Sequence, residues 1–263
     1  MEETQGSGEW VANDMTVKLS NTGARVATLN TERKLYADER NWEIVAALMK
    51  KLGIDILVLT EPGKADAKRM ADLQTWAILS GMTANTVNRS NSSLAGGMVI
   101  LTGTAWAGVA TKTHVFTSTV TDKDRAFAVE YDNRQQGEHN KLLVIGYYGL
   151  NASNTQQKEV KALHSWVWRI RRQFKQANWQ APVILVGDMN AAQTTMYDTD
   201  RLQQSEEMPG EDMEMEADAG TINHLEDLGF SDAIRLTHPT TRITTRRPPK
   251  KGVRREGMRH SGI

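Results

Sequence analysis

The chain has 263 residues, of which 39% are hydrophobic, and its 32 basic residues balance its 32 acidic residues. This length suits one large domain or two small ones, and the apolar content is enough for a continuous core. A net charge of zero excludes a whole-chain field that attracts nucleic acid or an anionic membrane, so polyanion binding requires a local patch. The absence of cysteine excludes disulfides, thiolate metal sites and a cysteine nucleophile.

The beginning of the chain has no targeting pattern. Its first residues, MEETQGSGEW, lack the basic and apolar blocks of a signal peptide. No apolar run in the sequence approaches the roughly 18 residues that a membrane span needs. We therefore expect a soluble, monomeric, intracellular protein without a membrane partner. Residues 1–22 hold only scattered apolar side chains, which predicts a flexible arm before a single domain at 23–263.

The domain begins with strand and helix patterns in alternation. Residues 25–30 alternate with period two, which predicts a strand. Residues 38–52 place apolar side chains three and four apart, which predicts an amphipathic helix with Asp38 as its N-cap and Gly53 at its end. Residues 54–60 are branched and almost wholly apolar, as in a strand that is buried on both faces. The strand-helix-strand order predicts that these two strands are parallel.

The middle of the chain is rich in strand patterns. A helix is predicted at 65–80. Strand-like runs without a helical period between them follow at 94–103, 107–120, 125–132 and 141–148. Polar turns separate these runs, which predicts an antiparallel meander. A long amphipathic helix at 155–177 and a buried strand at 181–186 come next.

Three segments carry unbalanced charge. Residues 198–218 hold nine acidic residues and one arginine, a net charge of −8, which predicts a mobile acidic loop. Residues 245–263 hold seven basic residues and one glutamate, a net charge of +6. This run suits a solvated loop, with a phosphate-contacting loop and a nuclear-import signal as alternatives, so a nuclear location stays open. The basic side chains of the 155–177 helix are interpreted as a solvated face.

Polar side chains follow four of the predicted strands at the point where each strand ends. They are Asn30, Glu61, Tyr148 with Asn151, and Asp188 with Asn190. In open α/β sheets the carboxyl ends of sequence-distant strands meet, and ligands bind there. Any one of these residues alone fits a cap or turn role. Together they offer oxygen ligands without thiolates, which favours a hard cation such as Mg²⁺ or Mn²⁺.

Five short motifs then occur in a characteristic order. They are NTE at 30–32, LVLTEP at 57–62, YYGLN at 147–151, GDMNA at 187–191 and LGFSDAIR at 228–235. With this order the chain resembles the endonuclease/exonuclease/phosphatase superfamily, which has the DNase I-like fold. Three features make it most similar to the apurinic/apyrimidinic-like endonuclease domains of non-long-terminal-repeat retrotransposons. They are GGMVIL at 96–101, GDMNAA at 187–192, and LGFSDAIRLTHP at 228–239 followed by ITT at 243–245.

The resemblance covers about residues 24–263 and carries expectations about fold and function. It implies an α/β fold, namely a two-sheet, four-layer α/β sandwich that lacks its last strands. The implied function is a metal-dependent phosphodiester hydrolase, namely a DNA endonuclease of retrotransposon type. Its implied cofactor is Mg²⁺, for which Mn²⁺ can substitute, and its implied partner is DNA.

The same resemblance implies which residues form the metal site. Glu61 stands at the position of the principal metal ligand. Asn30 matches an asparagine that holds this glutamate and the metal, and Glu32 matches an additional acidic contact in repair-type members.

The remaining site residues are implied to act on the water and the phosphate. Asp188 matches the aspartate that orients or deprotonates the attacking water, and Asn190 matches an asparagine that binds the scissile phosphate. Tyr148 and Asn151 match residues that contact phosphate oxygens. The chemistry supports these roles, because hydrolysis of a phosphodiester needs a nucleophilic water and a stabilised transition state.

The sequence departs from the pattern near its end. Relatives carry an Arg-x-Asp-Tyr run and then a Ser-Asp-His, and none of the six histidines here follows Ser-Asp. Leu150 replaces the proline that is usual between Tyr148 and Asn151. We therefore expect a fragment or a degenerate copy whose nicking of DNA is very slow or absent, with a reverse transcriptase in a longer product.

Two other functions stay open at this stage. One is a phosphomonoesterase of the same superfamily, or a sphingomyelinase, although no membrane-docking segment is visible in the sequence. The other is a catalytically inactive nucleic-acid-binding remnant, for which the missing terminal motifs are the supporting observation.

Overall fold

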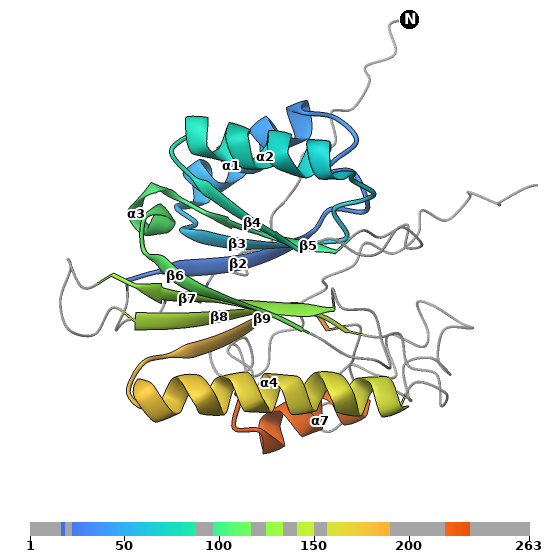
Figure 1. Cartoon of the computed structure of the whole chain (residues 1–263), viewed down its shortest axis with the longest axis vertical. Coiled ribbons are helices and arrows are strands. Elements are labelled where there is room, and N and C mark those ends of the chain that lie inside the picture. The colour runs from blue at the N-terminus through green and yellow to red at the C-terminus, as the bar shows by residue number, and fades with distance from the viewer. Residues whose placement is uncertain are drawn as a thin grey trace, which may run out of the picture.

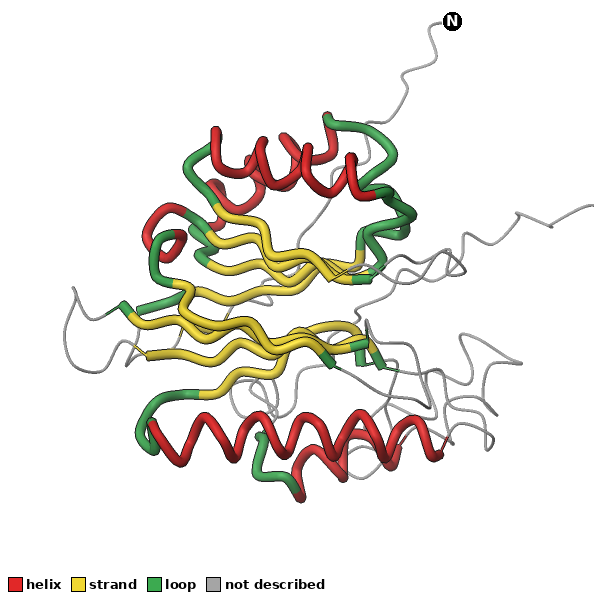
Figure 2. The backbone as a smooth tube through the Cα atoms, viewed as in Figure 1, coloured by secondary structure: helices red, strands yellow, loops and turns green. Residues whose placement is uncertain are grey.

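Two mixed β-sheets pack face to face, and helices cover the outer face of each sheet (Figures 1 and 2). The computed structural model describes residues 17–18, 23–87, 97–116, 125–133, 141–149, 157–189 and 219–231. The four layers, in the order helices, sheet, sheet, helices, confirm the predicted α/β sandwich.

The first sheet has five strands in the order β1-β2-β3-β5-β4. They are β1 (Val17–Lys18), β2 (Arg25–Asn30), β3 (Ile56–Thr60), β4 (Thr83–Val87) and β5 (Met98–Thr102). The chain crosses from β2 to β3 through α1 (Arg40–Leu52), and the two strands are parallel, as predicted. β5 pairs antiparallel with both β3 and β4. α1 and α2 (Ala67–Leu79) form the outer layer beside this sheet (Figure 1).

The second sheet has four strands in the order β6-β7-β8-β9. They are β6 (Ala110–Val115), β7 (Ala126–Asp132), β8 (Lys141–Tyr148) and β9 (Val183–Asp188). The first three form an antiparallel meander, and β9 is parallel to β8 because α4 (Gln157–Ala177) crosses over between them. α7 (Ala219–Asp227) packs beside α4 in the second helical layer (Figure 1).

The alternation of side chains along the central strands explains why their sequences are continuously apolar. In β3, Ile56 and Val58 face the second sheet, whereas Leu57 and Leu59 face α1 and α2. All four side chains are buried, because each face of the strand has its own covering layer. The core between the sheets therefore fixes how the two sheets sit against each other.

The helices behave largely as the sequence predicts. α4 buries its apolar seam, which includes Leu163, Val167, Ile170 and Phe174, against the second sheet. α1 ends at Gly53, which has a left-handed φ of 62°. The predicted N-cap is wrong, because α1 begins one residue later than a cap at Asp38 requires. The Asp38 carboxylate instead accepts a hydrogen bond from the backbone N–H of Arg40 at 2.9 Å.

Other elements differ from the predictions. The run at 94–103 does not join the meander, because β5 pairs with β3 and β4 and the short helix α3 (Thr104–Ala107) then carries the chain to the second sheet. β4 and α7 are not anticipated. β4 is a half-exposed sheet edge with a polar sequence, and the nine residues of α7 are too few for a clear period.

Several predictions fall on other parts of the chain. The acidic loop at 198–218 and the basic segment at 245–263 lie outside the described residues, as does most of the arm at 1–22. Within the segment predicted as a flexible arm, Val17–Lys18 forms β1 and pairs with Arg25 and Val26. Among the described helices, none combines the length and the apolar character that a membrane crossing requires.

A buried histidine links α4 to the second sheet and to α7. His164 is 3% exposed, and its Nε2 lies 3.2 Å from the Tyr147 hydroxyl. The His164 ring also stacks on the His224 ring, with 4.9 Å between the centroids. Burial, and next the neighbouring His224, lowers the pKa of His164 from 6.5 to about 4.

We predict that the free energy of unfolding decreases as the pH falls from 6.5 to about 4. In this window the unfolded chain binds a proton at His164 that the folded chain excludes, so the stability is complete above pH 6.5 and is lost on acidification. The lowered pKa corresponds to roughly 3 kcal/mol at most. Urea unfolding at a series of pH values measures the effect, and His164→Gln should flatten the curve in this window. His224→Gln, which removes only the smaller cause of the shift, should flatten the curve less. Parallel curves for His164→Gln and the wild type would contradict the prediction.

Candidate active site at the carboxyl ends of the strands

Four strands from both sheets end at one edge of the sandwich. Asn30 is the last residue of β2 and pairs in register with Thr60, the last residue of β3. Tyr148 and Asp188 are likewise the last residues of β8 and β9 and pair in register with each other. Because β9 packs against β2 and β3 of the first sheet, these chain segments meet. The strand predicted at 181–186 is observed as β9, which continues to Asp188 and so holds this carboxylate on a rigid element.

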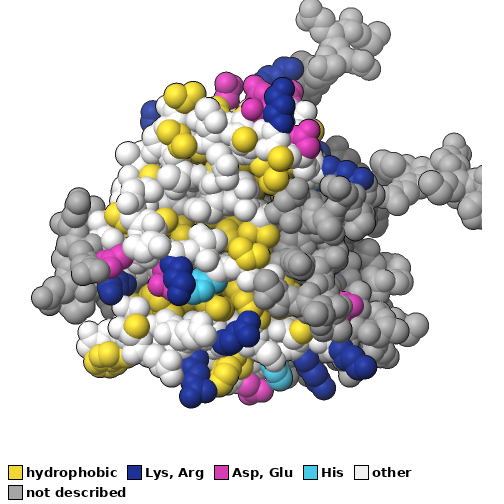
Figure 3. All heavy atoms as spheres, viewed as in Figure 1, with side chains coloured by type: hydrophobic (Ala, Val, Ile, Leu, Met, Phe, Trp, Pro, Cys, Tyr) yellow, Lys and Arg dark blue, Asp and Glu magenta, His cyan; other side chains and the backbone are white. Residues whose placement is uncertain are grey.

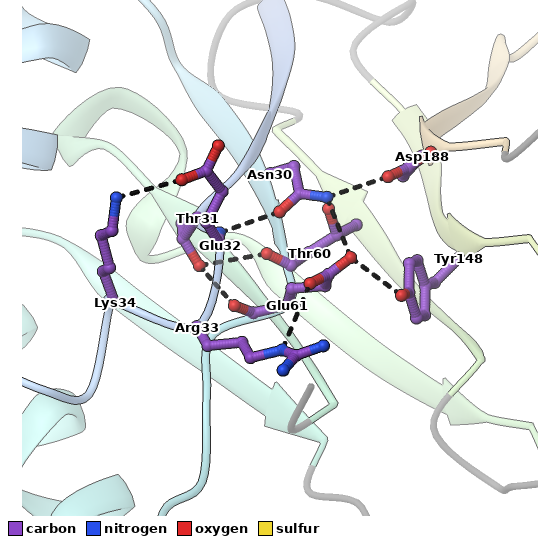
Figure 4. Close-up of polar contacts among 9 residues, drawn as sticks. All are labelled: Asn30, Thr31, Glu32, Arg33, Lys34, Thr60, Glu61, Tyr148 and Asp188. Carbon is purple, nitrogen blue, oxygen red and sulfur yellow. Dashed lines mark hydrogen bonds and ion pairs between the residues drawn. The ribbon is translucent and has the colours of Figure 1, made fainter. Parts of the chain in front are cut away.

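The Asn30 side chain joins the two carboxylates of the site (Figure 4). Its Nδ2 donates hydrogen bonds to Glu61 Oε1 at 3.1 Å and to Asp188 Oδ2 at 2.9 Å. Its Oδ1 accepts a hydrogen bond from the backbone N–H of Glu32 at 2.9 Å, which orients the amide. One side chain thus uses both protons of its amide to connect acidic groups that belong to different sheets.

Tyr148 adds a second donor to Glu61. Its hydroxyl donates to Glu61 Oε1 at 2.9 Å. Burial, followed by the hydrogen bond to Glu61 and the charge of that carboxylate, raises the pKa of Tyr148 to about 12. The phenol therefore keeps its proton at neutral pH and remains a hydrogen-bond donor at this position.

Glu61 itself has a strained backbone. Its φ is 50°, in the left-handed region that non-glycine residues rarely adopt. The adjoining loop holds it there, because the Glu61 carbonyl accepts hydrogen bonds from the Thr31 hydroxyl at 2.7 Å and from the Arg33 N–H at 2.7 Å. Such strain persists only where the surroundings determine the conformation, and it is commonly found at functional sites.

The oxygen donors of this site fit a hard divalent cation. Glu61 Oε1 accepts the bonds from Asn30 and Tyr148, whereas Oε2 forms a long ion pair with Arg33 Nε at 3.8 Å. The described residues contain no group of three or more acidic or histidine side chains that could hold a metal. Mg²⁺ does not need such a cage, since it is commonly bound by one or two carboxylates with several waters. Glu61 is the residue that could hold it, and Asn30 aligns that carboxylate.

Two arginines near the site were missed in the sequence. Arg125 places its guanidinium over the Tyr148 ring, 4.5 Å from the centroid, and donates to the Gly149 carbonyl at 2.8 Å. Its Nε is buried and has no hydrogen-bond partner among the described residues. Arg125 directly precedes β7 and therefore lies beside the end of β8. This position follows only from the pairing of the two strands, so the sequence pattern alone does not identify Arg125 as a site residue. Arg33 lies in the loop that supports Glu61 and is half exposed.

The other sequence-predicted residues are placed differently. The Glu32 carboxylate points away from Glu61 and pairs with Lys34 Nζ at 3.0 Å (Figure 4). Glu32 contributes its backbone N–H to Asn30 instead. Asn151 and Asn190 lie outside the described residues, so their predicted contacts with phosphate stay predictions.

Gly187 is required by the close approach of β9 to β8. Its φ is 155°, and a Cβ at this position would lie 1.8 Å from the Tyr147 carbonyl oxygen. We predict that Gly187→Ala lowers the free energy of unfolding by more than about 3 kcal/mol, because the clash is with the backbone of the paired strand β8, which cannot move aside as a flexible side chain can. Denaturant unfolding measures this effect. Gly108→Ala is a control, since a Cβ there meets nothing within 4 Å, and equal stabilities of the two variants would contradict the prediction.

Comparisons with known proteins bear on the fold. No protein-family model matches the sequence, and no curated protein matches it. An AP endonuclease from Archaeoglobus fulgidus is similar in structure, with a TM-score of 0.56 and 18% identity over 84% of this chain and 76% of that chain. The AP endonuclease from Leishmania major has a TM-score of 0.59 and 13% identity over 82% and 70% of the two chains.

A third structure, TDP2 from Caenorhabditis elegans, has a TM-score of 0.45 and 20% identity over 64% of this chain. This chain spans 47% of the length of that protein. The similarity to the two AP endonucleases, together with the strand order described above, shows that this chain has the DNase I-like fold.

Proposed function

We propose that this protein is a Mg²⁺-dependent phosphodiester hydrolase that nicks DNA, an endonuclease of the retrotransposon type. The observation that carries the proposal is the single network in which Asn30 connects Glu61 and Asp188. The two bonded residues Asn30 and Asp188 are 158 positions apart in the sequence. A cap or turn role for each residue gives no reason for the three side chains to meet.

The polar groups of the network suit the two demands of phosphodiester hydrolysis. Asp188 accepts a proton from the attacking water, and its bond from Asn30 keeps the carboxylate oriented. Tyr148 stays protonated and can donate a hydrogen bond where negative charge develops on the phosphate. Arg125 is a positioning residue in this scheme, because it stacks on Tyr148 and fixes its ring.

Glu61 is the residue that would hold the cation. A bound Mg²⁺ supplies electrostatic stabilisation of the charge on the phosphate oxygens and on the leaving group. Asn30 and Tyr148 both donate to Oε1 of Glu61, so they restrict the rotation of this carboxylate. The negative charge needed to attract a cation is thus held in one orientation.

Support for DNA as the substrate comes from outside the site. The chain shares its fold with two proteins described as AP endonucleases. The proposal of the retrotransposon branch is based on the sequence motifs GGMVIL, GDMNAA and LGFSDAIRLTHP followed by ITT. A phosphomonoesterase and a non-catalytic remnant of the same fold are the alternatives, and the experiments below separate them.

We predict that Glu61→Gln weakens Mg²⁺ binding by about tenfold or more, because it removes the charge that holds the cation. Asp188→Asn should leave Mg²⁺ binding within about threefold of the wild type and remove turnover, because it replaces a base by a neutral amide. Isothermal calorimetry measures the affinity. Glu43→Gln, on the exposed face of α1, is the charge-matched control. Equal Mg²⁺ affinity of the wild type and Glu61→Gln would count against the assignment.

We also predict slow Mg²⁺-dependent nicking of supercoiled plasmid when the protein is in excess. Asp188→Asn should reduce the rate by a factor of about 10² to 10⁴, the usual contribution of a positioned acid or base. Gel electrophoresis of the open-circular product gives the rate, with Glu43→Gln again as the control. Release of inorganic phosphate from inositol phosphates without nicking would favour the phosphomonoesterase. DNA binding without nicking in Mg²⁺ or Mn²⁺ would favour the inactive remnant.

A further inference from the structure

The outward face of α4 carries a stripe of basic and aromatic side chains, here termed the α4 stripe. Its members are Lys161, Trp168, Arg172, Lys175 and, just beyond the helix, Trp179. The spacings of three, four and seven residues place the helical members on one side of α4. The apolar seam that packs on the second sheet occupies the opposite side. The stripe from Lys161 to Lys175 is about 21 Å long, at 1.5 Å per residue.

Both tryptophans of the stripe are exposed to an unusual degree. Trp179 is 75% exposed and Trp168 is 43% exposed. A large aromatic side chain usually buries its surface, so two exposed tryptophans in and directly after one helix are informative. The Arg172 guanidinium lies over the Trp168 ring, 4.9 Å from its centroid, and Lys175 Nζ donates to the Trp179 carbonyl at 2.9 Å. The first contact holds a basic and an aromatic side chain together, and the second links Lys175 to the backbone of Trp179.

Positive charge dominates this helix. α4 contains six basic residues and one acidic residue. Among the described residues, Lys161, Arg169 and Arg172 form no ion pair with a carboxylate. Burial, and next the charge of Arg171, lowers the pKa of Lys175. Lys and Arg side chains accordingly lie along the lower margin of the molecule, over α4, in Figure 3.

We infer that the α4 stripe is a binding surface for single-stranded nucleic acid, separate from the metal site. Its basic side chains would contact the phosphates, and Trp168 and Trp179 would stack on unpaired bases. The length of about 21 Å spans about six nucleotides at the 3.4 Å rise of a strand stacked as in a duplex, and fewer nucleotides of an extended strand. The interpretation of these charges as a solvated face accounts for the basic residues alone. It gives no reason for the two exposed tryptophans among and beside them.

The chemistry of the stripe favours this occupant over others. A duplex presents phosphates but no free base faces, so it would leave both tryptophans unused. An anionic membrane would require an apolar face, and the stripe alternates apolar rings with charged groups. The surface goes beyond the proposed hydrolysis and does not depend on it, because α4 lies in the outer helical layer of the second sheet (Figure 1).

Binding can be measured without cleavage. The full chain carrying Asp188→Asn, in the presence of EDTA, is titrated into a fluorescein-labelled dT20 oligonucleotide, and anisotropy gives the affinity. The expected result is tighter binding of dT20 than of a 20-base-pair duplex, together with quenching of tryptophan fluorescence. Trp168→Ala should weaken dT20 binding about ten- to a hundredfold, the usual effect of losing one stacked base. Trp168→Phe should restore most of this loss, because phenylalanine still offers a ring face.

Matched variants test whether the location matters. Arg172→Gln with Lys175→Gln should weaken binding and lower the salt dependence, since each lost phosphate contact reduces the slope by about 0.7. Lys50→Gln with Lys51→Gln removes the same charge from the exposed end of α1, in the opposite helical layer, and should leave the affinity unchanged. Melting curves monitored by circular dichroism establish that each variant is folded.

Each other outcome overturns the inference. Equal losses in the α1 and α4 charge variants would mean that binding depends on overall charge. Heparin that binds as tightly as dT20 and is insensitive to Trp168→Ala would mean a charge-only surface. Preferential binding to phosphatidylserine vesicles would assign the stripe to a membrane. Because cleavage is not part of the measurement, a failure to nick DNA would leave this test unaffected.

Discussion

The candidate site depends on one amide that lies between two carboxylates. Glu61 directly follows β3 of the first sheet, and Asp188 ends β9 of the second. The two carboxylates would repel each other without the two protons of Asn30 Nδ2 between them. Hydrogen bonds to charged groups contribute about 1.5 to 3 kcal/mol each, which is comparable to the penalty of holding like charges together. The distance between the sheets is set by the apolar core that contains Val58, Phe127 and Val144. The packing of the core between the sheets therefore also determines the geometry of the site.

The loop after β2 is the second constraint. A left-handed residue costs roughly 1 to 3 kcal/mol, and Glu61 shares this conformation with Glu32 and Arg33 in the facing loop. The hydrogen bonds from Thr31 and Arg33 to the Glu61 carbonyl offset part of that cost. Gly63 permits the approach, since a Cβ there would lie 2.5 Å from the Arg33 carbonyl oxygen. The loops after β2 and β3 thus stabilise each other, and they restrict the orientation of the Glu61 carboxylate.

Much of this architecture could be predicted from the sequence because it follows from local patterns. Strong apolar runs identify β3 and β8, and the strand-helix-strand order gives the parallel pairing of β2 and β3. The periodicity of apolar residues does not show which sheet a strand joins, and for this reason the prediction places the run at 94–103, which contains β5, in the meander. The meeting of Asn30, Glu61 and Asp188 was predicted, but the direction of the Glu32 carboxylate was not. The direction of the Glu32 side chain follows from the left-handed φ of 49° at this residue, which no sequence pattern predicts.

The zero net charge of the chain conceals a separation of charge between its parts. The strand-end edge presents the carboxylates of Glu61 and Asp188, which repel a phosphodiester until a cation is bound there. α4, in contrast, has an excess of five positive charges and lies in the outer layer of the same sheet that delivers Asp188. A polyanion would therefore be attracted to α4 electrostatically, whereas its binding at the strand-end edge would require a bound cation. α4 connects β8 to β9 in the chain. The helix that would attract a nucleic acid therefore also joins the two β-strands that end at Tyr148 and Asp188.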